Sequence, residues 1–191
     1  MLAAGFSARL GRPKALARVH GAGLLARTLE TAQALDAAAV IAVIPPNAAR
    51  YRIAGRGMKV RWVANPQRAQ GLSSSVRRGI LAARHAPAIL LLPADLVSLK
   101  HRDLARLLRR RQSAPRRVIA RRVGRGAAIP LILPRWLFPR ALKVSGDIGL
   151  REMIEQLAPE QRVLVDLASA ARDVDTPQAL DAVRRRFRPG G

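Results

Sequence analysis

Short aliphatic runs alternate along the chain with segments in which apolar residues recur at helical spacing. The runs have the length and composition of buried strands, and several end at proline or polar residues. They cover residues 40–44, 59–63, 88–92, 118–120, 131–133 and 163–167. The segments with helical spacing cover residues 24–35, 74–84, 102–111, 148–157 and 178–187. Strands that alternate with helices predict a three-layer α/β/α, Rossmann-like fold with a mostly parallel sheet.

The length of 191 residues suits one domain with a substantial hydrophobic core. We expect this domain to span residues 1–187 and residues 188–191 to form a flexible basic tail. The chain has no cysteine, which excludes disulfides, thiolate zinc sites and cysteine nucleophiles. Its longest apolar run, 86–99, is interrupted by prolines and is too short to cross a bilayer. No basic leader precedes Ser7, so we predict a cytoplasmic protein without membrane contact.

The chain is strongly basic, with 35 Lys+Arg against 12 Asp+Glu and a net charge of +23. Only four of the basic residues are lysines, and this skew, together with abundant alanine, is typical of codon usage in a GC-rich genome. Such a surface attracts phosphate-bearing partners, but 3% aromatic residues are few for a protein that stacks nucleic-acid bases. We therefore expect no specific nucleic-acid partner. The arginines of residues 106–125 allow three interpretations: a nucleic-acid surface, a docking patch for an acidic protein, or a solvated helix face.

Residues 2–14 are the first candidate for chemistry. Gly5 and Gly11 let the backbone pass close to a ligand, and Arg9, Arg12 and Lys14 add cations to the same short loop. Backbone N–H groups and cations together suit a triphosphate, although the spacing is not that of a Walker A loop. The alternative is an ordinary glycine turn on a basic surface.

A second glycine-containing segment imitates a dinucleotide-binding fingerprint. Residues 21–26 fit G-x-G-x-x-A, but no good strand precedes them and no acid follows at the distance that a ribose contact requires. We interpret this segment as a turn into a helix.

Two further segments place polar residues where ligands bind in α/β folds. The Asn65-Pro66 pair leads to residues 71–75, whose serines we expect to cap a helix N-terminus, an end that also favours anions. Asp95 stands just past the 88–92 strand, where a carboxylate can hold Mg²⁺ between phosphate oxygens. The alternative for Asp95 is a loop or helix-capping aspartate.

Two acidic turns complete the candidates. In residues 146–151 we expect Asp147 to cap a helix, with Arg151 nearby. Asp173 and Asp175 lie on one side of an extended segment that precedes Thr176 and Pro177, a helix start. Acids that converge on one metal would form a phosphoryl-transfer site, but their spacing alone leaves convergence open.

In their order along the chain, these segments resemble the MobA-like NTP transferases, and most of all their molybdenum cofactor cytidylyltransferase branch. Residues 2–14 match the opening L-A-A-G-x-S-x-R-x-G-x-x-K, and residues 65–75 match N-P-x(4)-G-L-S-S-S. Residues 91–95 resemble the strand end with the metal aspartate, 146–151 the G-D-x-G-x-R turn, and 173–177 the D-x-D-T-P segment. Guanylyl-transferring relatives usually open with L-A-G-G and carry a G-P-L-A-G-like stretch. Ala4 and the serine-rich run therefore favour the cytidylyl branch.

The resemblance implies a Mg²⁺-dependent nucleotidyltransferase that moves CMP from CTP to molybdopterin cofactor and releases pyrophosphate. It also implies transient contact with a molybdoenzyme or its chaperone. The implied site residues are catalytic Arg9, Lys14 and Asp95; metal-binding Asp95 and Asp175, with Asp173 in reserve; acceptor-binding Asp147 and Arg151; and nucleotide-binding Leu2, Ala3, Ala4, Gly5, Arg9, Gly11, Lys14, Asn65, Gly71, Ser73, Ser74 and Ser75. The alternatives are a guanylyltransferase or another NTP transferase of this fold, and a noncatalytic nucleotide or cofactor carrier for a molybdoenzyme.

The chain departs from the family pattern at several points. The family has a short hydrophobic strand before L-A-A-G, whereas this chain begins at Met1, so we expect a truncated first strand. Residues 96–97 are Leu-Val where Gln-Pro is typical. Ile148 stands where a lysine is common, and Ile129 where a histidine is usual. We expect these changes to affect acceptor handling more than nucleotide binding.

Overall fold

The computed structural model describes residues 1–5, 13–19, 21–95 and 99–167. The strands in this part of the chain are β1 (Arg18–Val19), β2 (Ala22–Gly23), β3 (Ile41–Ile44), β4 (Arg61–Ala64), β5 (Ala88–Leu91), β6 (Val118–Val123), β7 (Gly126–Pro134) and β8 (Arg162–Val165). The α-helices are α1 (Leu24–Gln33), α2 (Ala49–Ala54), α3 (Leu72–Ala82), α4 (His101–Ser113), α5 (Phe138–Ala141) and α6 (Gly149–Glu155). Short 3₁₀ turns lie at Lys14–Leu16, Arg68–Gln70, Arg135–Leu137 and Pro159–Gln161.

The hydrophobic pattern located most of these elements. Each of the six expected strands is present, and β7 is longer than the run that predicted it. Four expected helices correspond to α1, α3, α4 and α6, whereas the fifth, at 178–187, lies outside the described residues. The interpretation of residues 21–26 is also confirmed, because the short β1–β2 hairpin turns there into α1. The pattern missed α2 and α5, which have six and four residues and are too short to show a helical period.

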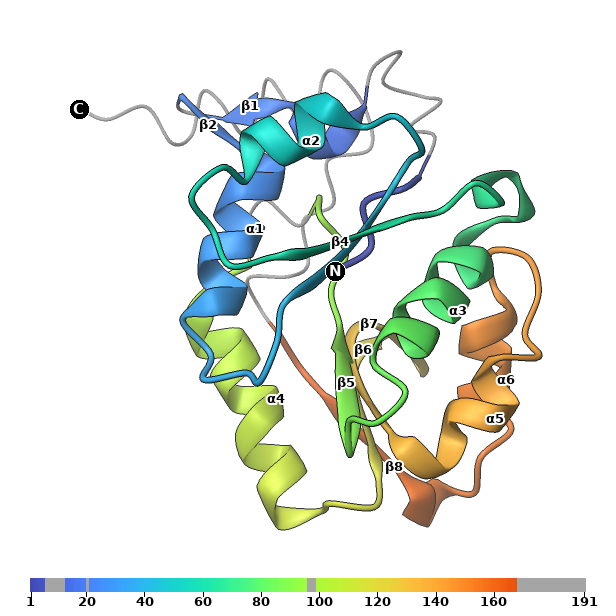
Figure 1. The fold of residues 1–191 in the computed structure, drawn as a ribbon. Helices are drawn as coiled ribbons and strands as arrows, with labels where there is room; N and C mark the ends of the chain where they lie inside the picture. Colours follow the sequence, from blue (N-terminus) through green and yellow to red (C-terminus); the bar gives the residue numbers. More distant parts are fainter. Residues whose placement is uncertain (6–12, 20, 96–98, 168–191) are drawn as a thin grey trace.

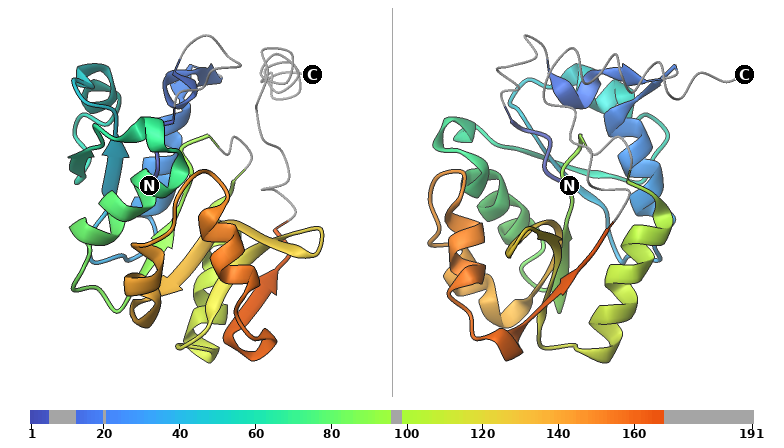
Figure 2. Two further views of the ribbon diagram at one scale, coloured as in Figure 1. Left: turned by 90° about the vertical axis from the view of Figure 1, so that its right-hand side faces the viewer. Right: turned by 180° about the vertical axis from the view of Figure 1, so that it is seen from behind.

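Helices cover both faces of a central sheet. In Figure 1, α1 and α4 lie on one side of the strands, and α3, α5 and α6 lie on the other. The view from behind in Figure 2 shows the same two groups. The expected three-layer architecture is therefore present.

The sheet is mixed, with parallel pairing at most of its strand junctions. β3 pairs with β4 in parallel, and β6 pairs with β8 in parallel. Leu2 forms parallel bridges to Val43 and Pro93, which join the β3–β4 pair to the β5-β7-β6-β8 sheet. β7 runs antiparallel to both of its neighbours, β5 and β6. A hairpin connects β6 to β7 through a two-residue turn, and this short link forces the antiparallel direction.

Residues 1–4 occupy the position of a central strand. The N–H of Leu2 donates to the Leu92 carbonyl at 2.7 Å, and the N–H of Ala3 donates to the Val43 carbonyl at 2.8 Å. The amino group of Met1 donates to the Ile41 carbonyl at 2.7 Å. Met1 is 8% exposed, so this amino group lies inside the sheet. The expected short first strand is thus held from both sides by ladder hydrogen bonds.

Amphipathic helices enclose the core. On α4, Leu104 and Leu107 are fully buried, whereas Arg102, Arg106 and Arg109 are exposed. Burying each such leucine contributes roughly 1.5–3 kcal/mol, which fixes this helix to β6 and β7 although its outer face is basic. Among the described helices, none has the length and apolar character needed to cross a membrane.

Candidate functional site

A cleft of about 590 Å³ opens where the first residues and β5 end at the same edge of the sheet. This is the edge at which open α/β sheets bind their ligands. Chain segments that are far apart in sequence meet there. The described residues that line the cleft are Leu2, Ala3, Ala4, Gly5, Lys14, Ala15, Arg68, Ala69, Gly71, Leu72, Ser75, Pro93, Ala94, Asp95, Arg121, Val123, Ala128, Ile129 and Asp147.

Lys14 and Asp95 form an ion pair inside the cleft. The Lys14 Nζ lies 2.8 Å from the Asp95 Oδ2, with the lysine side chain 9% exposed and the aspartate side chain 33% exposed. Lys14 comes from the 3₁₀ turn after the first loop, and Asp95 follows β5. A buried ammonium is costly without a negative partner, so the carboxylate stabilises Lys14 in this position. The structure thus brings together two of the three residues that the sequence suggested as catalytic.

Gly5 is the last described residue of the first loop. A Cβ placed on it would meet nothing within 4 Å, so the backbone here faces open space in the cleft. Ala3 and Ala4 stand beside it, held by the sheet hydrogen bonds of the first residues. Arg9 and Gly11 lie outside the described residues.

The N-terminus of α3 is capped from a distant loop rather than by its own serines. The N–H of Leu72 donates to Asp147 Oδ1 at 2.8 Å, and the N–H of Ser73 donates to the Gly146 carbonyl at 3.1 Å. The expectation that the serines cap this helix is therefore wrong. Ser74 Oγ donates instead to the Gly71 carbonyl at 2.8 Å. Asp147 was expected to cap the helix that follows it, but its carboxylate caps the N-terminus of α3 instead.

Gly71 makes this capping contact possible. It has φ of +83°, and a Cβ there would lie 2.7 Å from Asp147 Oδ1 and 2.8 Å from the carbonyl carbon of Gly146. The left-handed conformation and the missing side chain let the 146–147 turn approach the helix.

Asn65 organises the α3 start from behind the cleft wall. It is fully buried, and its Nδ2 donates to Ser74 Oγ at 2.8 Å and Ser75 Oγ at 3.1 Å. Its Oδ1 accepts the N–H of Gln67 at 3.0 Å. Gly71 and Ser75 line the cleft, whereas Asn65, Ser73 and Ser74 are absent from its lining. Of these expected nucleotide-binding residues, Gly71 and Ser75 therefore border the cleft. The other three support the residues that border it.

The two expected acceptor residues lie apart. Asp147 lines the cleft, but Arg151 does not. The Arg151 Nε donates to Glu155 Oε1 at 2.7 Å on the outer face of α6, where both side chains pack over Gly126.

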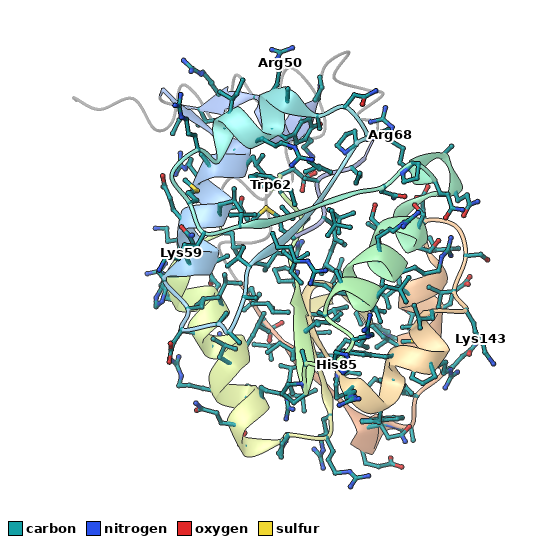
Figure 3. The ribbon with its side chains drawn as sticks, in the orientation of Figure 1. Arg50, Lys59, Trp62, Arg68, His85 and Lys143 are labelled. Carbon is teal, nitrogen blue, oxygen red and sulfur yellow. The ribbon has the colours of Figure 1, made fainter. Side chains whose placement is uncertain are left out.

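The cleft is also lined by two arginines and an aliphatic wall that the sequence motifs did not indicate. Arg68 follows β4 and lies beside the turn into α3 (Figure 3). Arg121 comes from β6 and is 9% exposed. Val123 and Ile129 add apolar surface beside Arg121. The sequence does hold one sign of Arg121: this charged residue comes directly after the buried Val-Ile-Ala run of a strand. A charge is unusual in that position unless it has a function or a partner.

The described carboxylates of the cleft are Asp95 and Asp147, and no cluster of three or more metal-ligating side chains occurs in the described part of the chain. Asp173 and Asp175 lie outside that part. One carboxylate together with substrate phosphates suffices for Mg²⁺, which usually keeps several waters. Asp95 therefore fits a metal that a nucleotide brings with it.

Comparison with protein families gives the decisive match: the model of the MobA-like NTP transferase domain matches residues 1–163. The chain belongs to this family. Its members are nucleotidyltransferases, and the cleft at the sheet edge, with Lys14 and Asp95 in the expected motifs, lies within the matched region.

Among curated proteins, this MobA-like chain is 36% identical over 121 residues to a phosphoenolpyruvate guanylyltransferase from Conexibacter woesei. That alignment covers 60% of this chain and 52% of the relative, so it spans about half of the relative's length.

Solved structures extend the likeness to nearly the whole fold. Rv0371c from Mycobacterium tuberculosis is 26% identical, with a TM-score of 0.77 and coverage of 96% of this chain and 94% of that one. Molybdopterin-guanine dinucleotide biosynthesis protein A from Archaeoglobus fulgidus has a TM-score of 0.73 at 14% identity, covering 97% and 95%. The latter likeness concerns the fold alone.

Proposed function

We propose that this protein transfers a nucleoside monophosphate, CMP from CTP, to the terminal phosphate of molybdopterin cofactor and releases pyrophosphate. The observation that carries the proposal is the Lys14–Asp95 pair at 2.8 Å, on the cleft that Ala3–Gly5 border. A cation and an acid side by side at a backbone loop match the needs of a triphosphate and its metal ion.

Each described residue has a defined task in this reaction. The backbone of Ala3–Gly5 binds triphosphate oxygens, and Lys14 offsets their charge. Asp95 holds Mg²⁺, which supplies charge neutralisation at the phosphates; Asp175 is the second proposed ligand. A crystal structure of Rv0371c in complex with manganese supports a divalent cation in this fold, at 23% identity and a TM-score of 0.72.

The chemistry is an in-line displacement at the α-phosphorus. An oxygen of the acceptor phosphate forms the new P–O bond, while the bond between the α-phosphorus and the bridging oxygen breaks. Pyrophosphate leaves with that electron pair. No covalent enzyme intermediate is needed, so the protein contributes positioning and electrostatic stabilisation.

The choice of CTP rests on Ala4 and the Gly71–Ser75 run, which resemble the cytidylyl branch. A second candidate is guanylyl transfer to phosphoenolpyruvate, which the 36% identical guanylyltransferase favours. The same cleft suits both reactions, because both acceptors present a phosphate to an α-phosphorus. Contact with a molybdoenzyme or its chaperone stays a prediction.

The test begins with calorimetric titration of CTP, GTP and ATP, with and without Mg²⁺. We expect Mg²⁺-dependent binding with preference for CTP; preference for GTP would favour the second candidate. Absence of binding to folded protein would contradict both.

Turnover is then followed as pyrophosphate release with molybdopterin or phosphoenolpyruvate as acceptor. Asp95→Ala should abolish Mg²⁺-dependent turnover while the protein stays folded. Asp166→Asn is the matched control, because Asp166 is an exposed carboxylate that pairs with Arg122 outside the cleft. Retained activity of the Asp95 variant would refute the metal assignment, and nucleotide binding without any turnover would indicate the noncatalytic carrier.

A further inference from the structure

The turn at residues 144–147 is attached to α3 by more than its two capping contacts. This turn lies between α5 and α6, on the side of the sheet where α3 also lies (Figure 1). Besides the hydrogen bonds from the N–H groups of Leu72 and Ser73, the Arg77 Nη1 donates to the Val144 carbonyl at 2.6 Å. Arg77 stands one helical turn beyond Ser73 on α3. The turn is therefore bound at two levels of the helix.

This third contact restricts a motion that the other two allow. Leu72 and Ser73 are neighbours in the chain, so their two hydrogen bonds leave rotation of the turn about the line through them. A contact one helical turn further along removes that rotation. Val144 and Asp147 are three positions apart. Holding the Val144 carbonyl therefore limits where the Asp147 carboxylate lies.

The other nitrogen of the Arg77 guanidinium binds the segment before α3. Its Nη2 donates to Gln70 Oε1 at 2.7 Å. Gln70 belongs to the 3₁₀ turn Arg68–Gln70, part of which lines the cleft. One planar group with several fixed donors thus joins this 3₁₀ turn, α3 and the 144–147 turn.

The segments that Arg77 joins form one continuous part of the cleft wall. Gly71, Leu72 and Ser75 line the cleft from α3 and the residue before it, and Asp147 lines it from the 144–147 turn. Arg77 is half-buried and is not among the described residues that line the cleft. Its printed partners are oxygens of the protein, so it holds the wall from behind.

We propose that Arg77 is a positioning residue for the transfer reaction, which keeps the 144–147 turn and its Asp147 in register with the wall at the start of α3. This inference rests on the proposed nucleotidyl transfer and on Asp147 at the acceptor end of the cleft. An in-line displacement needs the attacking oxygen and the α-phosphorus in close alignment, and a misplacement of about 1 Å can reduce the rate on the order of a hundredfold. Arg77 acts on that alignment through the turn, without contact to the reacting atoms.

The first test compares turnover with nucleotide binding in Arg77→Met, which keeps an aliphatic stem and removes both donors. Turnover is followed as pyrophosphate release, and the nucleotide Kd is measured by calorimetry. We expect kcat/KM for the acceptor to fall between about tenfold and a hundredfold. The nucleotide Kd should stay within about twofold, because its proposed ligands belong to the first loop and α3, whereas the variant releases the 144–147 turn.

Two further variants separate positioning from a general loss of charge or stability. Arg78→Met is the matched control, since it removes the same charge from the next position on α3, which is also half-buried. Its kcat/KM should stay within about twofold of wild type. Arg77→Lys keeps the charge and can reach one of the two partners, so it should recover part of the loss. Equal losses in Arg77→Met and Arg78→Met would overturn the proposal, as would a rise in the nucleotide Kd that accounts for the lost turnover.

Hydrogen exchange at the backbone amides of Leu72 and Ser73 tests the same contact without turnover. These N–H groups donate to the 146–147 part of the turn. Release of the turn in Arg77→Met should raise their exchange rates roughly threefold to tenfold, while amides in the middle of α3 keep theirs. Unchanged exchange at both amides would overturn the proposal. Faster exchange in the variant, with a wild type that turns over no nucleotide, would contradict the proposed function and leave Arg77 a purely structural role.

Discussion

The carboxylate of Asp147 accepts the backbone N–H of Leu72 at 2.8 Å, across 75 residues of sequence. This contact anchors the turn before α6 on the first turn of α3, and both residues line the cleft. The negative charge also interacts favourably with the positive end of the helix dipole. The N-terminus of α3, an end that favours anions, thus already holds one of the protein's own carboxylates.

Replacing Asp147 should therefore destabilise the fold through α3. We expect Asp147→Ala to lower the free energy of unfolding by about 1 kcal/mol, the typical cost of losing a helix N-cap. Asp147→Asn should lose less, because its amide oxygen can still accept the N–H. Urea denaturation measures both, and equal losses would show that the hydrogen bond is not what stabilises this junction.

Gly71 should tolerate a side chain poorly for two separable reasons. Gly71→Ala adds strain at φ of +83° and places a Cβ 2.7 Å from Asp147 Oδ1. Gly57→Ala is a matched control, because Gly57 has φ of +82° and open space around its Cβ position. We expect a loss of roughly 1–2 kcal/mol for the control and a larger loss for Gly71→Ala. Thermal or urea unfolding of both variants gives the comparison; equal losses would exclude the steric contact as a cause.

The Lys14–Asp95 pair should show energetic coupling. Lys14→Met and Asp95→Asn each remove one partner of a contact at 2.8 Å in which the lysine is nearly buried. A double-mutant cycle on unfolding free energies should give a coupling energy of roughly 1.5–3 kcal/mol, typical of a hydrogen bond to a charged group. Additive effects would mean that the two side chains do not stabilise each other.

Mild acid should destabilise this chain through the buried Met1 amino group. Burial lowers the pKa of the Met1 amino group from 8.0 to about 5. Between these pH values the unfolded chain binds a proton at this group and the folded chain does not, so the free energy of unfolding falls as pH decreases from 8 to 5. Three pKa units correspond to a loss of about 4 kcal/mol.

Urea denaturation at constant ionic strength across this range tests the expectation. The control is the His20→Gln, His85→Gln, His101→Gln triple variant, which contains no histidine and keeps the Met1 amino group. The slope should persist in this variant, and a flat profile would contradict a buried, neutral amino group.

Much of the fold followed from local pattern. The aliphatic runs at 40–44 and 88–92 are strands because their residues are apolar on both sides, and α4 is a helix because its leucines recur at helical spacing. The motifs of residues 2–14 and 65–75 also indicated the family. What the pattern could not supply was the direction of β7, the short helices and the partner of each polar group, since these depend on contacts between distant segments.

For the candidate site, too, the sequence indicated some residues and the structure added the contacts between them. The motifs were enough to indicate a glycine-containing loop with Lys14 and an aspartate at the end of a strand. Three facts come from the folded chain: Lys14 contacts Asp95, Asp147 rather than a serine caps α3, and Arg121 borders the cleft. Helical and strand periodicity reports which side of an element is apolar. The pairing of side chains across a cleft depends on strand order, which no local pattern encodes.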